Sequence, residues 1–162
     1  MTVRATRLSP LNGLDPALDA LRVEASVSGF LFLDRLEADW KSGNNRFDAP
    51  GEILLGAYVA EKLVGVGGLN RDPYEIGGSV GRIRHLYIAQ SCRQHGVGSG
   101  LLNAILDHAG EHYETVRLRA DTAAASQFYL RHGFEAIDHI WATHVRPLNA
   151  RERRAARVQS MT

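Results

Sequence analysis

The chain has 162 residues, 44% of them hydrophobic and 23% charged, a composition that excludes a disordered or fibrous protein. Its formal net charge is +1, but four arginines and one glutamate give residues 149–162 a charge of +3 and leave −2 for the rest. We therefore predict one acidic domain over residues 1–148 and a basic tail over 149–162. Such a domain has no basic surface for nucleic acid, so we expect no nucleic-acid partner.

Membrane insertion and disulfide bonding are not expected. The apolar stretch Ile53–Ala60 is far shorter than the roughly 20 residues that cross a bilayer, and the first residues have no apolar core of signal-peptide length. We therefore predict a cytoplasmic location and no membrane partner. The single cysteine, Cys92, excludes an internal disulfide and a cysteine-based zinc site.

The first predicted elements are a strand and two helices. Residues 2–8 alternate polar and apolar side chains, a period of two that is typical of a half-buried strand. Asp15 and Pro16 form a start signal for a helix that ends before Ser28. Apolar residues at helical spacing predict a second helix over 30–41.

The rest of the chain alternates strands and helices less regularly. Ile53–Ala60 and Leu63–Leu69 are strand-forming runs separated by two residues, so we expect them to pair as an antiparallel hairpin. The order β-α-α-β-β-β-α-β-α-β-β predicts an α/β fold with a mixed sheet, and edge pairing of the late strands would give a homodimer. The remaining predicted elements are a strand over 82–89, a helix over 98–112, a strand over 116–120, a helix over 123–132 and strands over 134–137 and 141–145.

The most informative segment is the turn Arg93-Gln-His-Gly-Val-Gly-Ser-Gly100, between a predicted strand and an amphipathic helix. Its glycines let the backbone come close to a ligand, and the first amides of the helix carry partial positive charge, so the turn suits phosphate oxygens. A P-loop is excluded, because no lysine accompanies these glycines. A dinucleotide-binding turn is the weaker alternative, since Leu101 replaces its third glycine and two helices and a hairpin precede it.

Three segments together resemble the GNAT N-acetyltransferase superfamily. Arg93-Gln-His-Gly-Val-Gly98 resembles its Gln/Arg-x-x-Gly-x-Gly/Ala loop, and His85-Leu-Tyr-Ile88 resembles its Leu-x-Val strand. Phe128-Tyr-Leu-Arg-His-Gly-Phe134 resembles its Phe-Tyr-x-x-x-Gly-Phe segment. The similarity is close over residues 53–137, and the element order extends it to 2–145. It implies a GNAT-like fold in which helices flank a central splayed mixed sheet.

The resemblance also implies that acetyl-CoA is the co-substrate. In this family the glycine-containing loop holds the pyrophosphate with backbone amides, and a strand edge offers main-chain groups to the pantetheine arm. Thr122 stands where the family frequently has asparagine, and its hydroxyl can replace part of the amide's hydrogen bonding. The residues implied in cofactor binding are Leu86, Tyr87, Ile88, Arg93, Gln94, His95, Gly96, Val97, Gly98, Ser99 and Thr122.

For catalysis, the resemblance implies that Tyr129 protonates the departing coenzyme A thiolate. Many members carry a glutamate or histidine base at positions that match Arg82 and Arg84, and arginine cannot accept a proton. These arginines would bind a carboxylate or phosphate of the acceptor, or they are ordinary surface or ion-paired side chains. His85 is the nearest group that titrates near neutral pH and is the candidate base. Water-mediated routes to Glu37, Asp72 or Glu75 stay open.

We expect an N-acetyltransferase that moves the acetyl group to a primary amine of a small molecule or protein by direct attack. The predicted acceptor-binding residues are Arg82, Arg84, Asn70 and Asp72. The alternative is a catalytically silent acyl-CoA-binding sensor or interaction module. No metal is predicted: His108 and His112 are four residues apart on a predicted helix, but the sequence offers no third ligand in view.

Overall fold

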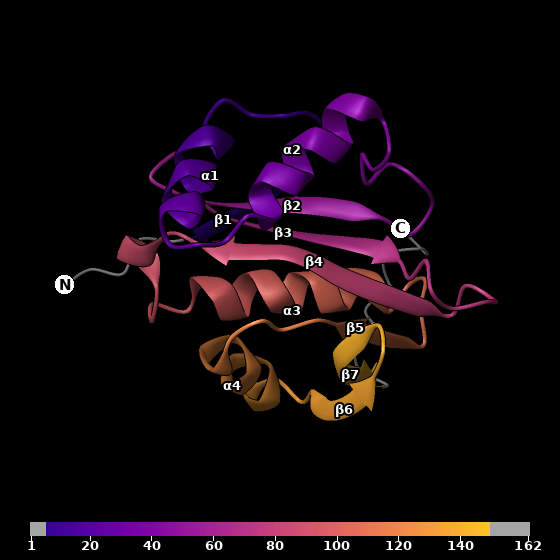
Figure 1. Cartoon of the computed structure of the whole chain (residues 1–162). Coiled ribbons are helices and arrows are strands. Elements are labelled where there is room, and N and C mark those ends of the chain that lie inside the picture. The colour runs from indigo at the N-terminus through magenta and orange to yellow at the C-terminus, as the bar shows by residue number, and fades with distance from the viewer. Residues whose placement is uncertain (1–5, 150–162) are drawn as a thin grey trace.

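The computed structural model describes residues 6–149, and Figure 1 shows its layers. A seven-stranded mixed sheet separates α1 and α2 on one face from α3 on the other. None of the described helices is both long and apolar enough to cross a bilayer. The elements are β1 (Thr6–Pro10), α1 (Leu18–Val27), α2 (Phe32–Ser42), β2 (Ile53–Val59), β3 (Lys62–Arg71), β4 (Val80–Ile88), the short 3₁₀ helix η1 (Gln90–Cys92), α3 (Val97–Ala109), β5 (Thr115–Leu118), α4 (Ala123–Arg131), β6 (Glu135–His139) and β7 (Ala142–Pro147).

The sheet is parted along its middle. Its strand order is β1-β2-β3-β4-β5-β7-β6, and every neighbouring pair is antiparallel except β4 and β5, which are parallel. Their pairing is confined to Val80–Arg82 against Thr115–Arg117. Beyond Arg82, β4 continues to Ile88 without a strand partner on that side among the described strands. This length of β4 therefore offers free main-chain groups to a ligand.

Each face of the sheet has its own hydrophobic core. Leu33 and Leu36 of α2 pack with the sheet residue Val66 on one face, and all three are almost inaccessible to solvent. On the other face, the predicted apolar stripe of α3 packs mainly against β3 and β2. Burial of each such leucine stabilises the fold by roughly 2 kcal/mol before entropy is counted. The two cores fix the helices relative to the parted strands.

The predicted α/β class and order of elements are confirmed, with differences at the ends of elements. Asp15 accepts a hydrogen bond from the Ala17 amide at 2.9 Å, as a start signal should, but regular α1 begins only at Leu18. Trp141 lies in the turn between β6 and β7, whereas we expected it in a strand. The predicted start of the first strand at residue 2 and nearly all of the predicted basic tail lie outside the described residues.

A bulge interrupts β4 beside the parting. Between the pairs Gly68–Arg84 and Val66–Tyr87, β3 advances by two residues and β4 by three. His85 takes up the extra length with a left-handed φ of +60°, which is uncommon outside glycine. Such a bulge bends its strand locally and increases its twist.

Candidate acetyl-CoA and acceptor cleft

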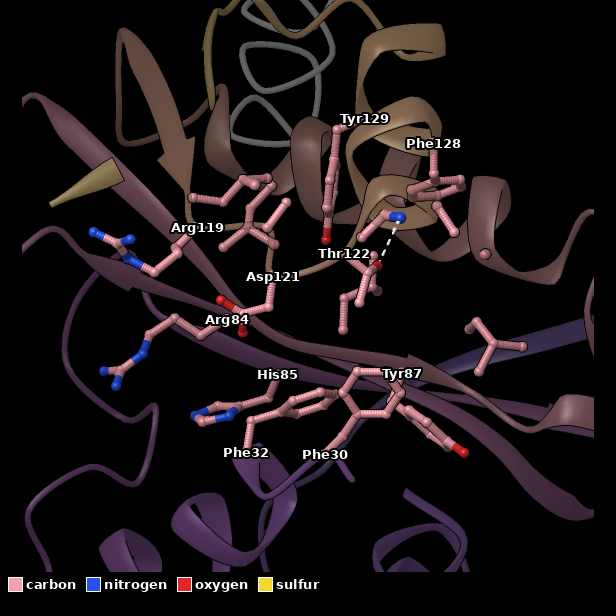
Figure 2. Close-up of a pocket in the computed structure, with 18 of the residues that line it drawn as sticks. Phe30, Phe32, Arg84, His85, Tyr87, Arg119, Asp121, Thr122, Phe128 and Tyr129 are labelled. Carbon is pink, nitrogen blue, oxygen red and sulfur yellow. Dashed lines mark hydrogen bonds between the residues drawn. The ribbon is translucent and has the colours of Figure 1, made fainter. Parts of the chain in front are cut away.

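A cleft of about 930 Å³ opens where β4 and β5 part. Its volume is typical of small-ligand sites. In Figure 2, side chains of β4 and of the segment before α2 form one wall, and α4 with the preceding residues forms the other. The turn before α3 lines the cleft too, so the sequence segments that carry the family resemblance meet at this one site.

The turn before α3 presents unpaired backbone amides. Gln94 and Gly96 both have positive φ, +65° and +82°, and Gly96 is the N-cap of α3. No side chain caps this helix, and the amide of Gly100 is the first to bond back, to the Gly96 carbonyl at 3.0 Å. The amides of residues 97–99 therefore have no backbone partner in the described chain, as expected at a helix start. This is the geometry of an anion site.

The predicted pyrophosphate residues contribute in different ways. Arg93, Gln94, Gly96, Gly98 and Ser99 line the cleft. The His95 side chain is exposed and does not line the cleft. Val97 is buried in the core, so only its main chain could meet a phosphate.

Two of these side chains already have partners within the protein. Arg93 donates its Nε–H to the Ile88 carbonyl at 3.0 Å. His132 at the end of α4 lies 2.7 Å from the Phe128 carbonyl through Nδ1 and 3.0 Å from the Ser99 hydroxyl through Nε2. A carbonyl only accepts, so Nδ1 of the neutral ring carries the proton and Ser99 donates to Nε2. This pair of bonds holds the start of α3 against α4.

On β4, the predicted pantetheine-binding residues Leu86, Tyr87 and Ile88 all line the cleft and belong to the unpaired length of the strand. The Tyr87 side chain is buried and its hydroxyl donates to Glu24, and burial with this contact raises the pKa of Tyr87 to about 12. It is therefore a neutral part of the core wall. Its contribution to a ligand would come from the backbone.

His85 differs from what a general base requires. It packs against the rings of Phe32 and Phe47, and both of its ring nitrogens lack a well-formed hydrogen bond. Burial, with a smaller effect from the Arg84 charge, lowers the pKa of His85 to about 3. A ring with this pKa is neutral at physiological pH but binds protons weakly. The structure therefore disfavours the predicted base role and gives His85 a place in the wall.

Tyr129 and Thr122 lie on the opposite wall. The ring of Tyr129 is buried, and Figure 2 shows its hydroxyl directed into the cleft toward β4. Burial raises the pKa of Tyr129, so the phenol keeps its proton. Thr122 caps α4: its hydroxyl oxygen accepts the Ala125 amide at 3.1 Å, which leaves the hydroxyl hydrogen available. Both groups can donate a hydrogen bond into the gap.

The end of the cleft away from the turn is rich in arginine. In Figure 2, Arg84 and Arg119 extend from opposite walls toward the same end of the cleft, and Arg35 of α2 lines the same cleft. Arg119 donates to the Ile140 carbonyl at 2.7 Å, and none of these three guanidinium groups is ion-paired within residues 6–149. Tyr74 and Trp141 stack nearby with ring centres 4.2 Å apart. These groups form an aromatic and cationic rim, which suits an anionic ligand group.

Three predicted acceptor residues have structural partners instead. The side chain of Asp72 is inaccessible to solvent and binds Arg117 at 2.6 and 3.2 Å. Arg82 lines the cleft but contacts Asp72 at 3.4 Å. Asn70 is buried outside the cleft, where its amide bonds to Asn45 and Glu52. Of the four predicted acceptor residues, Arg84 alone faces the cleft without such a partner.

Asp121 was not among the predicted catalytic or acceptor-binding residues. It is exposed, lies between β5 and α4 three residues after the end of the strand, and contributes the one carboxylate that lines the cleft among the described residues. In Figure 2 it lies between Arg84 and the hydroxyl of Tyr129. The carboxylates predicted to accept a proton through water form ion pairs instead: Glu37 contacts Arg22 and Lys41, and Glu75 contacts Arg117. Its place in the connection between a strand and a helix was the available signal.

The parted sheet and its cleft are those of the acyl-CoA N-acyltransferases, enzymes that transfer an acyl group from coenzyme A to an amine. Comparison with family models makes the assignment specific. The acetyltransferase (GNAT) domain matches residues 27–143, so the chain belongs to the GNAT acetyltransferase family. No curated protein matches the sequence.

Solved structures agree on the fold. A provisionally assigned acetyltransferase from Exiguobacterium sp. 255-15 superposes with a TM-score of 0.80 at 24% identity, covering 98% of this chain and 99% of that one. A GNAT-family acetyltransferase from Staphylococcus aureus Mu50 gives a TM-score of 0.70 at 14% identity, covering 90% and 100%. A GCN5-related N-acetyltransferase from Kribbella flavida gives 0.68 at 19%, covering 89% and 98%. At these identities the fold alone is shared.

Proposed function

We propose that this enzyme transfers an acetyl group from acetyl-CoA to the primary amine of an acceptor that also carries a carboxylate or phosphate. The observation that carries the proposal is the cleft itself. It joins an uncapped helix start, a free strand edge, an inward tyrosine hydroxyl and a rim of arginines that form no ion pair within residues 6–149. The gap between β4 and β5 would let the thioester reach from the helix start toward the arginine rim.

The turn and β4 would hold the co-substrate. The amides of residues 97–99 would bind the pyrophosphate, and the main chain of Leu86–Ile88 would hydrogen-bond the pantetheine arm. A backbone amide on the bulged part of β4 would stabilise the negative oxygen that forms during attack. The fit rests on the free amides and the unpaired edge described above.

The reaction needs a neutral amine and an outlet for its proton. The amine nitrogen attacks the thioester carbonyl carbon, the C–S bond breaks, and an N-acetylated acceptor and coenzyme A form. Asp121, directly or through water, would accept the proton that the amine loses. Tyr129 would donate a hydrogen bond to the departing sulfur. Complete transfer of its proton would give the coenzyme A thiol. The nearby arginine charges would also lower the pKa of the bound ammonium, which favours the reactive neutral form.

Arg84 gives the sharpest test of the acceptor class. We expect acetyl-CoA-dependent thiol release with amines that bear a carboxylate or phosphate, and much weaker release with the matching uncharged amines. Arg84→Gln should raise KM for the anionic acceptors by about tenfold or more, because a charge-assisted hydrogen bond is lost. Arg46→Gln is the control, since Arg46 is exposed and bonds to the Trp40 carbonyl outside this cleft.

The alternatives predict other outcomes. Equal turnover of neutral and anionic amines would show that the acceptor needs no anionic group, while the proposed acetyl transfer would still hold. Binding of acetyl-CoA with no turnover on any amine would instead favour the silent acyl-CoA-binding module.

A further inference from the structure

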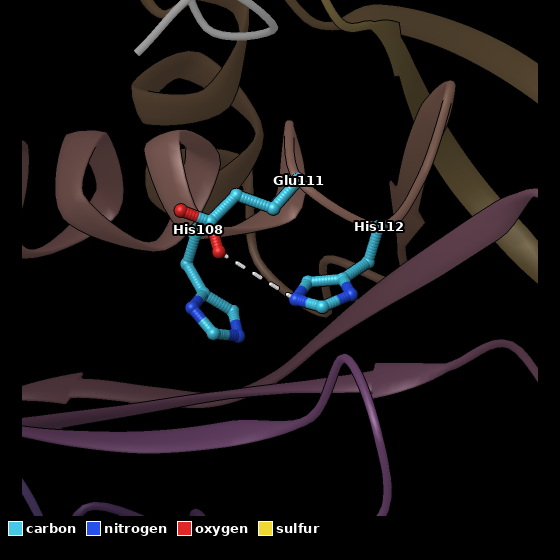
Figure 3. A group of neighbouring side chains, drawn as sticks. All are labelled: His108, Glu111 and His112. Carbon is cyan, nitrogen blue, oxygen red and sulfur yellow. Dashed lines mark ion pairs between the residues drawn. The ribbon is translucent and has the colours of Figure 1, made fainter. Parts of the chain in front are cut away.

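A second group of chemically active side chains lies at the other end of α3. His108 is in the last turn of the helix, and Glu111 and His112 follow in the turn after it. The spacing of three and four residues places all three on one side of the chain. One ligand atom from each lies within 4.8 Å of the others, and Figure 3 shows the side chains converging. Glu111 thus adds a third potential ligand beside the two histidines.

The contacts among these groups are long, and one long ion pair joins Glu111 to His112. The Glu111 carboxylate is 3.7 Å from Nε2 of His112, beyond normal hydrogen-bonding distance. The rings of His108 and His112 are 5.2 Å apart and tilted by 42°, which is not a close stack. Nε2 of His108 is buried and has no hydrogen-bond partner in the described part of the chain. An unpaired buried nitrogen costs free energy, and binding to a cation would remove that cost.

Two imidazoles and one carboxylate are a zinc-binding set. They leave one position of a tetrahedron for water, and their nitrogen donors favour first-row transition metals over Mg²⁺ or Ca²⁺. The end of α3 adds a partial negative charge from its last carbonyl groups, which also favours a cation. We propose that His108, Glu111 and His112 form a binding site for a divalent transition-metal ion, of which zinc fits best.

This site is separate from the acetyl-transfer cleft. None of its three residues lines the cleft, and the 13-residue length of α3 puts about 20 Å between its two ends. Its surroundings suggest a structural effect. A Cβ on Gly51 would lie 2.8 Å from the Tyr113 hydroxyl and 3.1 Å from Cβ of His112, so the chain before β2 packs tightly on this turn. A metal ion fixing the turn would stabilise this packing.

The test uses the full chain freed of metal. We expect one Zn²⁺ per chain in a competition titration against a chromogenic chelator, and Co²⁺ should give the visible absorption bands of tetrahedral coordination. Zn²⁺, but not Mg²⁺, should raise the melting temperature, because the ion binds the folded state.

Glu111 and His112 are exposed, so their substitution should leave the fold intact, which circular dichroism would verify. Glu111→Gln and His112→Ala should each weaken Zn²⁺ binding by at least about tenfold and abolish the melting shift. His139→Ala is the matched control, since His139 is an exposed histidine on β6, and it should bind as wild type. Equal Zn²⁺ affinity in wild type and both ligand variants, or no saturable binding by wild type, would overturn the proposal.

Discussion

At the residue scale, the cleft combines groups whose ionisation is fixed by burial. Tyr129 keeps its proton and His85 stays neutral, because burial disfavours the charged form of each ring. Asp121 is exposed to solvent. The sequence motif singled out Tyr129, and this residue lines the cleft. It could not reveal that His85 is enclosed by Phe32 and Phe47, because that enclosure depends on how α2 packs on the sheet.

Replacement of Tyr129 by phenylalanine should lower turnover with little change in binding. The substitution removes the hydroxyl and keeps the ring that packs with Phe128 and Phe134. Loss of the donor to the leaving sulfur should reduce kcat by about 100-fold, within the range for general acids. Thiol release would measure kcat, and calorimetry would measure acetyl-CoA affinity. An unchanged kcat would remove the tyrosine from the mechanism.

His85 should make stability depend on pH in the mildly acidic range. Its pKa is about 3 in the folded protein, so the unfolded chain, with a pKa near 6.5, binds more protons between these values. Stability from this group is therefore complete above about pH 6.5 and falls as the pH drops. Its contribution should decrease by about 2 kcal/mol from pH 7 to pH 5. Urea unfolding of His85→Phe should show a smaller loss over this interval; an identical loss would contradict the assigned burial.

At the element scale, the start of α3 depends on backbone conformation. Gly96 has a left-handed φ of +82°, and a Cβ added at this position would meet no atom within 4 Å, so the requirement for glycine is conformational rather than steric. The glycine pattern predicted the turn and the helix that follows. It could not predict the bulge at His85, because register depends on the pairing of β4 with β3. The glycine pattern also could not predict which side chains of the turn face the cleft.

Gly96→Asp should weaken acetyl-CoA binding by at least about 100-fold, because the carboxylate repels the pyrophosphate and the backbone is strained. Gly100→Ala is the control in the same helix: its added methyl meets nothing within 4 Å. That control should bind acetyl-CoA as wild type and be more stable by about 0.5–1 kcal/mol, since alanine favours helix. Calorimetry and urea unfolding measure the two effects. Equal affinity in all three proteins would refute the role of the turn.

At the scale of the whole molecule, a buried ion cluster joins the two halves of the sheet at the closed end of the parting. Asp72 follows β3 and contacts Arg82 of β4 and Arg117 of β5. The stacked rings of Tyr74 and Trp141 add a second link between segments far apart in the chain. Sequence patterns predicted the order of elements, but the Asp72–Arg117 and Tyr74–Trp141 contacts span 45 residues or more and have no local signature. Because the ion pair with Arg117 could not be predicted, Asp72 was expected to bind the acceptor.

Asp72→Asn should destabilise the protein by about 3 kcal/mol, because it removes the only buried carboxylate that contacts Arg82 and Arg117 within residues 6–149 and leaves Arg117 with the partly exposed Glu75 alone. Glu75→Gln is the matched control: Glu75 contacts the same Arg117 at 3.0 Å but is partly exposed, so its loss should cost less than about 1 kcal/mol. Thermal and urea unfolding measure both values. Similar effects of the two substitutions would contradict the assigned role of Asp72.

The same cluster should weaken in acid. Burial alone would raise the pKa of Asp72, but the hydrogen bond and charge of Arg117 lower it overall. Its stabilisation is therefore present above the unfolded value near pH 4 and is lost as the pH falls further.

The most direct test of the account is a crystal structure of the protein with acetyl-CoA. We predict the pyrophosphate on the amides of residues 97–99, the pantetheine arm along Leu86–Ile88 and the thioester sulfur within hydrogen-bonding distance of the Tyr129 hydroxyl. Density for the cofactor elsewhere on the surface, with the gap between β4 and β5 filled only by solvent, would contradict it.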